Sequence, residues 1–171
     1  HHGPHSKGIV WAHNTHIGDA RFTDMPDAGE INLGQLVRER YGQEKCFLLG
    51  FSSFRGQVIA GRSWDAPMQV MPLPEARRGS WDELLHRTSM EDKLFLFSDL
   101  DHAEDLLEMR GQRAIGVVYN TEREHLGNYV PTLLSKRYDA LLYFEKTDAL
   151  RPLPVRLHKE KDLPDTYPST F

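Results

Sequence analysis

The sequence alternates short, β-rich apolar runs with segments of helical period, and few folds accommodate such an alternation. Six runs have the length and residue types of strands: 8–13, 46–51, 57–64, 93–100, 114–119 and 139–145. Three of them, near residues 9, 94 and 115, are almost continuously apolar, which is typical of strands covered on both faces. The run at 57–64 is more amphipathic and indicates an edge strand or a hairpin arm.

Helical signals lie between these runs, in the segments 32–42, 80–89, 102–111 and 129–138. The first segment lies between an N-cap candidate, Asn32, and Gly42. Its expected buried face consists of Leu33, Leu36, Val37 and Tyr41. Ser80 and Glu83 have the spacing of a capping box, and Pro131 is a candidate for a helix start. The alternation predicts an α/β fold, with a largely parallel sheet flanked by helices.

The domain organisation follows from length and local composition. A chain of 171 residues fits one domain. Residues 65–79 carry three prolines without a regular period, so we expect a long surface loop there. Residues 150–171 form a Pro-rich, charged tail, which leaves 1–149 as the folded part. The chain begins with HHGPHSKG rather than Met, and we therefore expect it to be a fragment of a larger domain whose N-terminal part is missing.

Composition excludes several classes of protein. Hydrophobic residues make up 39% and charged residues 27%, as in soluble globular proteins. The formal net charge is -4 and there is no Lys/Arg stripe, which argues against a nucleic-acid partner. No apolar run is long enough to span a bilayer. Cys46 is the single cysteine, so no disulfide framework exists and a reducing, cytoplasmic location is expected.

The main chemical feature is a histidine pair, His13 and His16, directly after the first apolar run. Ligands bind at the carboxyl ends of strands in open α/β sheets, and imidazole is the usual general base near neutral pH. The pair therefore predicts catalytic residues, with polar loop positions as the alternative interpretation. A metal site would need a third ligand from a nearby carboxylate, and Asn14 stands where HExxH has Glu. We rank a metal-free site first.

Three further residues are candidates for substrate binding. Asp19 can orient a histidine as the third member of a triad, or it can close an Asx turn. Arg55 follows the second apolar run and can contact a substrate or be solvated. Tyr129 can donate to a ligand or anchor packing. The loop around Arg55 has neither the spacing of a nucleophile elbow nor that of a phosphate loop, so water is the expected nucleophile.

Several stretches, in order, resemble the erythromycin esterase family. They are IVWAHNTHIGDAR, NLGQLVRERYG, LLGFSSFRGQVIAGRSWDAPMQVMPLP, GSWDELLH, RAIGVVY, GNYVPTLLSKRYDALLYF and the closing YPS. The block W-x-H-N-x-H-x-G-D is the most specific of these marks. The resemblance covers nearly the whole chain and is to the C-terminal part of the family only.

This resemblance implies an α/β protein that hydrolyses a macrolide lactone, a cyclic ester, with an activated water and without a metal or other cofactor. Such activity confers antibiotic resistance. His13 and His16 match the histidines that line the family's active site. A further Glu, His and Arg come from an N-terminal half that this chain lacks, so the fragment alone is expected to be inactive.

The expected partners are a small-molecule ester, that N-terminal half and a phosphoribosyltransferase-like domain, to which some family members are linked. The alternatives to an esterase are a non-catalytic accessory domain beside such a partner, or a metal-dependent hydrolase.

Overall fold

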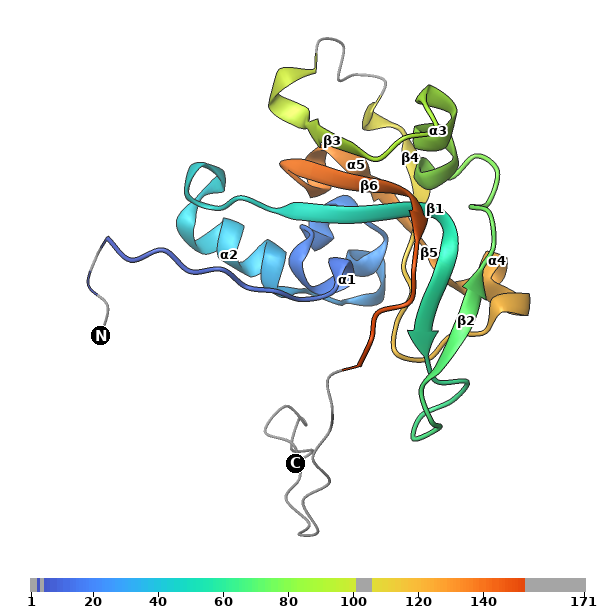
Figure 1. Ribbon diagram of the computed structural model, residues 1–171. Coiled ribbons are helices and arrows are strands. Elements are labelled where there is room, and N and C mark those ends of the chain that lie inside the picture. The colour runs from blue at the N-terminus through green and yellow to red at the C-terminus, as the bar shows by residue number, and fades with distance from the viewer. Residues whose placement is uncertain (1–2, 4, 101–105, 153–171) are drawn as a thin grey trace, which may run out of the picture.

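A computed structural model describes residue 3, residues 5–100 and residues 106–152 of the chain (Figure 1). Its strands are β1 (Leu49–Ala60), β2 (Gln69–Leu73), β3 (Lys93–Leu96), β4 (Met109–Arg113), β5 (Tyr129–Leu133) and β6 (Ala140–Thr147). Its α-helices are α1 (Asn14–Ile17), α2 (Leu33–Tyr41), α3 (Trp81–Thr88), α4 (Glu124–Gly127) and α5 (Leu134–Arg137). No helix in these ranges is long and apolar enough to cross a membrane.

The strands form a four-stranded sheet of order β2-β1-β6-β3 and a separate pair, β4-β5. Only β1 and β6 are parallel, and every other pairing between these strands is antiparallel. The mixed α/β class is confirmed, but the expected largely parallel sheet is wrong for the residues described. A parallel pair needs a long crossover, and β2 follows β1 directly as a hairpin arm, whereas β3 and β6 are far apart in the chain and still pair antiparallel.

Strand β1 is one bent strand where the sequence predicted two, at 46–51 and 57–64. Its first half pairs with β6 and its second half with β2. The strand bends where these pairings change, as Figure 1 shows. Gly56 lies there with φ 138°, and a Cβ atom would collide with the backbone of Thr147. The expected hairpin arm is confirmed, and β2 replaces part of the loop expected at 65–79.

Two predicted strands are absent from the described residues. Residues 8–13 join no strand ladder, and Ile9 and Trp11 are 95% and 90% exposed. Residues 114–119 form only an isolated bridge, between Val118 and Gly61. Both segments have strand-forming side chains, but neither forms a ladder with a strand in the ranges described. Pairing, which sequence period does not reveal, decides these assignments.

Helices α2 and α3 lie where the sequence predicts them. Asn32 caps α2, and the hydroxyl of Ser80 accepts a hydrogen bond from the Glu83 backbone N–H at the start of α3. The predicted buried face of α2 is wrong, because its apolar side chains are exposed or half-buried. Gly34 and Arg38 are buried instead. A side chain at Gly34 would collide with the backbone of Ile17, so the glycine permits close contact between α2 and α1.

The other two helix predictions are wrong in part. Residues 109–111 belong to β4, and residues 102–105 of the segment predicted at 102–111 lie outside the described ranges. In the segment 129–138 the strand β5 comes first, and α5 begins at Leu134 rather than at Pro131. Antiparallel pairing of β4 with β5 satisfies these backbone groups and overrides the helical period. Of the expected tail, 153–171 also lies outside the structure's description.

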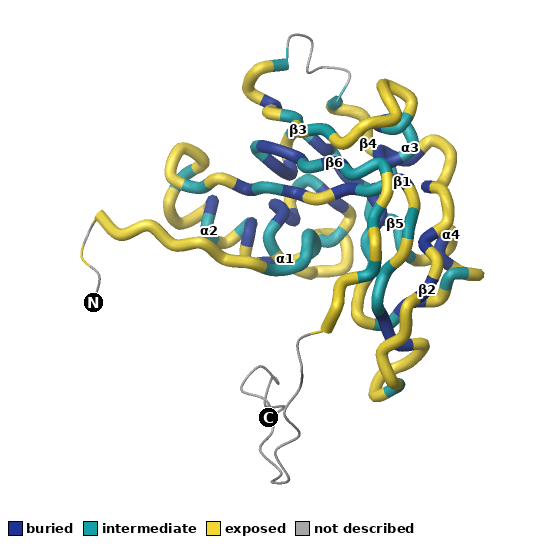
Figure 2. The backbone as a smooth tube through the Cα atoms, viewed as in Figure 1, coloured by how far each residue is buried: buried dark blue, intermediate teal, exposed yellow. Residues whose placement is uncertain are grey.

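The core lies on one face of the four-stranded sheet. Its main cluster contains Phe54 of β1, Leu141 and Tyr143 of β6, and residues of α3 and α5 such as Trp81 and Leu134. Buried and exposed positions alternate along β1, as Figure 2 shows. The buried positions in the first half of β1, which are Gly50, Ser52 and Phe54, therefore lie on the core side of the sheet, and the intervening positions lie on the other face.

Candidate functional site

The two histidines lie on and next to α1. His13 is the N-cap of this short helix, and its Nδ1 accepts a hydrogen bond from the Thr15 backbone N–H at 3.3 Å. The same nitrogen lies 2.8 Å from the Thr15 hydroxyl. His16 is exposed, and its side chain makes no hydrogen bond to any residue in the described ranges. The two ring centroids are 6.3 Å apart, so the structure brings the predicted pair together.

The surroundings of His13 keep its imidazole neutral. Burial lowers its pKa most, while a hydrogen bond with the backbone of Ile115 opposes this effect. The positive charges of His16 and Arg137 lower the pKa further. The result is a pKa below the ordinary value of 6.5, and His13 is therefore uncharged at neutral pH.

Asn14 fixes α1 to the edge of β1. Its Nδ2 donates to the Phe51 carbonyl at 2.6 Å, and its Oδ1 accepts from the Phe51 N–H at 3.0 Å. The side-chain amide thus satisfies both backbone groups of one strand residue, as a neighbouring strand would. The polar residue between the two histidines is therefore an anchor that places both rings beside the sheet.

A buried arginine, Arg137, binds the backbone of α1. Its Nη2 donates to the Asn14 carbonyl at 3.2 Å, and its Nη1 donates to Thr132 Oγ1 at 2.8 Å and to Gln112 Oε1 at 3.2 Å. It is 1% exposed and forms no ion pair with any carboxylate of the described residues. A Cβ atom at Gly18 would lie 2.6 Å from Arg137 Nε. Because Gly18 has no side chain, it leaves the space that the Arg137 side chain occupies next to α1.

Asp19, the first candidate for substrate binding, is fully buried in an arginine network. Its carboxylate lies 2.7 Å from Arg21 Nη2 and 3.4 Å from Arg38 Nη1. Burial alone would raise the pKa of Asp19, but the hydrogen bonds and charge of Arg21, with that of Arg38, outweigh burial and lower it. No hydrogen bond joins Asp19 to either histidine. Its predicted role in substrate binding or histidine orientation remains a prediction.

The other two candidates lie in separate networks. Arg55 is exposed, with its guanidinium 3.5 Å from Glu75 and 3.9 Å from Glu145. The hydroxyl of Tyr129 donates to Glu124 Oε1 at 2.7 Å and accepts from the Arg77 backbone N–H at 2.8 Å. Burial raises the pKa of Tyr129 to about 12, with Glu124 adding to the effect. Neither residue contacts the histidine pair, and their roles in binding remain predictions.

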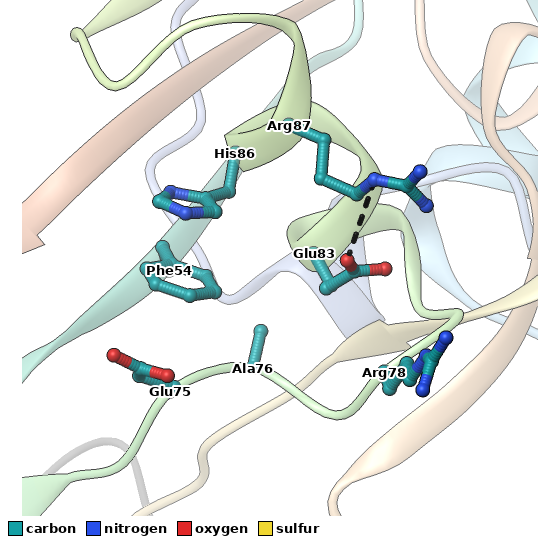
Figure 3. A pocket seen from close by; sticks show the side chains of 7 residues that line it. All are labelled: Phe54, Glu75, Ala76, Arg78, Glu83, His86 and Arg87. Atoms are coloured by element: carbon teal, nitrogen blue, oxygen red, sulfur yellow. Dashed lines mark ion pairs between the residues drawn. The ribbon is translucent and has the colours of Figure 1, made fainter.

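A shallow pocket of about 500 Å³ lies at α3 (Figure 3). It is lined by Phe54, Glu75, Ala76, Arg78, Glu83, His86 and Arg87. The ring of His86 stacks on Phe54 at 3.7 Å, and its Nδ1 lies 2.9 Å from Glu145 Oε2. None of the five predicted site residues lines this pocket. Its positive and negative side chains are mixed, and it indicates no single class of ligand.

Sequence reasoning missed the residues that hold the histidine pair in place. Asn14 and Gly18 stand inside the HNxHxG block, and their spacing relative to the histidines was the available signal. Arg137 lies more than a hundred residues away along the chain, and a single arginine beside Tyr138 gives no such signal. Among the residues that the structure describes, no group of three or more His, Cys, Asp or Glu side chains is placed to hold a metal ion.

Comparisons with known proteins agree with this architecture. Three solved structures share the fold, and the match covers 33% of the length of each. A Bacillus cereus protein is 19% identical with a TM-score of 0.67 over 82% of this chain, and a succinoglycan biosynthesis protein is 20% identical with a TM-score of 0.62 over 81% of this chain. A histidine-to-asparagine mutant of the erythromycin esterase EreC in its open conformation is 21% identical with a TM-score of 0.54 over 84% of this chain. The chain therefore spans about a third of the length of these proteins. The model of the erythromycin esterase family matches residues 1–147. This match covers most of the chain, and the chain therefore belongs to the erythromycin esterase family.

Proposed function

We propose that this chain supplies part of the active site of a hydrolase that cleaves a carboxylic ester, of the macrolactone type, with water. The observation that carries the proposal is the pair of imidazoles on α1. One ring is held and neutral, and the other is exposed beside it. Family membership supports ester hydrolysis as the reaction, and it does not identify the substrate.

The geometry favours different roles for the two histidines. The ring of His13 is engaged by Thr15 and by the backbone of Ile115, so His13 is a positioning residue that starts α1. His16 is exposed and has a ring free to contact a ligand. We therefore assign His16 as the residue that touches the substrate.

In the proposed reaction, water attacks the ester carbonyl and His16 donates a hydrogen bond to the oxyanion that forms. The bond between the carbonyl carbon and the alkoxide oxygen then breaks. The proton lost by the water passes to the alkoxide, which leaves a carboxylic acid and an alcohol. The base that takes this proton belongs, in this proposal, to a part of the protein outside the 171 residues. No serine or cysteine nucleophile is required.

The test is hydrolysis of macrolides and simple aryl esters by the full-length protein, with and without chelator. We expect His16→Ala to lose turnover and keep the wild-type melting temperature, because the side chain is exposed. His125→Ala, which removes a histidine from the exposed surface of α4, serves as the matched control and should retain turnover. Turnover that survives His16→Ala would remove this histidine from the mechanism. A folded protein that hydrolyses no ester would favour an accessory role, and loss of turnover with chelator would favour a metal-dependent hydrolase.

A further inference from the structure

The second face of the four-stranded sheet is apolar and uncovered. Phe51, Leu142 and Leu94 lie side by side across β1, β6 and β3 in the strand register. Leu96 and Phe144 lie on the same face, two residues further along their strands. We name these five residues the open face.

The open face contributes nothing to either core cluster among the described residues. Leu94 is 57% exposed and Phe51 is 39% exposed, although both lie within strands of the main sheet. Neighbouring positions on the same strands, such as Leu141 and Tyr143, are fully buried on the opposite face. The sheet is therefore packed on one side only.

An aromatic row extends this surface toward the histidine pair. The ring centroid of Phe51 lies 6.5 Å from that of Phe144 and 6.3 Å from that of Trp11. Trp11 is 90% exposed and precedes His13 by two residues. The uncovered apolar surface therefore reaches from the middle of the sheet to the start of α1.

The exposure of the open face differs from what the apolar pattern of its strands predicts. The run beginning at residue 93 and the run at 139–145 are apolar at successive positions, a pattern typical of strands with both faces covered. Leaving apolar side chains in water forfeits the main favourable term in folding. The side-chain pattern thus fits a second layer that these residues do not provide.

We propose that the open face is covered by a further part of the same polypeptide, outside these 171 residues, which packs apolar side chains of helices onto it. The solved structures with this fold are about three times as long as the segment matched, which provides chain for such a layer. Ile9, Val10 and Trp11 precede α1 and are themselves apolar and exposed, and Trp11 lies beside Phe51 of this surface. The inference deepens the proposed function, because the covering layer would lie beside His16.

Covalent footprinting of the full-length wild-type protein tests the proposal directly, because the reagent labels only side chains that are in contact with water. Matched residues of the same type lie elsewhere: Trp64 is 75% exposed beyond β1, and Leu126 is 75% exposed on α4. We expect labelling of Trp11 and Leu94 to be several-fold lower than labelling of Trp64 and Leu126. Labelling at equal levels would overturn the proposal.

The mass in solution separates one polypeptide from two copies of it. Protection of the open face in a monomer, unchanged on dilution, supports the proposal. If the protein forms a dimer, and both the dimer and the protection disappear on dilution, a second copy covers the face and the proposal is overturned. Neither readout depends on turnover, so the proposed function and this inference can fail separately.

A pair of variants gives an independent measure. Leu94→Asp in the full-length protein should lower the melting temperature by several degrees or prevent folding, because it would bury a charge under the covering layer. Leu126→Asp should leave the melting temperature near that of the wild type. Equal melting temperatures for the two variants would contradict a covered face.

Discussion

Replacement of Gly18 by alanine tests how the histidine helix is held. The new Cβ would lie 2.6 Å from Arg137 Nε and 2.7 Å from Tyr138 Cε1, well inside ordinary contact distance. Both neighbours are 1% exposed, so neither can move away without disturbing the core. Overpacking of this kind costs about 1–3 kcal/mol, from which about 0.4–1 kcal/mol is recovered because alanine restricts the unfolded chain. We expect a net loss of roughly 1–2 kcal/mol in the free energy of unfolding.

Urea denaturation followed by circular dichroism measures this loss, with Gly116→Ala as the matched control. A Cβ atom at Gly116 meets nothing within 4 Å, so that variant should be as stable as the wild type or slightly more stable. Ester hydrolysis by the full-length Gly18→Ala protein should also fall, because a displaced Arg137 shifts α1. If Gly18→Ala is as stable as Gly116→Ala, the gap at Gly18 is not what admits the guanidinium, and this account of the motif is wrong.

Three further predictions concern the polar contacts around α1. Arg38→Met breaks a buried ion-pair network and should cost about 3–5 kcal/mol in chemical denaturation, whereas Arg55→Met, at an exposed pair, should change stability by under about 1 kcal/mol. The pKa of Asp19 is lowered in the folded state, so its contribution is present above about pH 4 and lost as the pH falls through the folded pKa. The Asp19→Asn variant should therefore lose less stability than the wild type as the pH falls through that range. Asn14→Ala removes both hydrogen bonds to Phe51 and should cost about 1–3 kcal/mol and reduce ester hydrolysis; unchanged hydrolysis would show that α1 needs no such anchor.

Local signals in the sequence were sufficient for some elements and insufficient for others. The caps at Asn32 and Ser80 act within one turn of chain, and both helices begin where they predict. The period of α2 gave the wrong buried face, because Gly34 packs on the Ile17 backbone and Arg38 reaches two distant carboxylates. Such partners are brought close only by the fold, so hydrophobic period alone could not indicate them.

The strands show the same division. The residues of β6 and of the hairpin arm in β1 have strand propensity and also find partners, so their prediction holds. The run at 8–13 has equal propensity but no partner in the described part of the chain, and residues 109–111, the end of the helix predicted at 102–111, pair with β5 instead. Strand formation requires a second segment with free backbone groups, and that requirement is non-local.

For the candidate site, the sequence by itself determined the chemistry available: two imidazoles three residues apart, with an amide between them and a glycine after them. The tertiary structure decided how each is used. Contacts with Phe51 and Arg137, from β1 and α5, fix α1, and the backbone of Ile115 engages one imidazole while the other stays exposed. Residue types fix what a side chain can donate or accept, but only the packing of distant segments decides which groups it meets and how far it is removed from water.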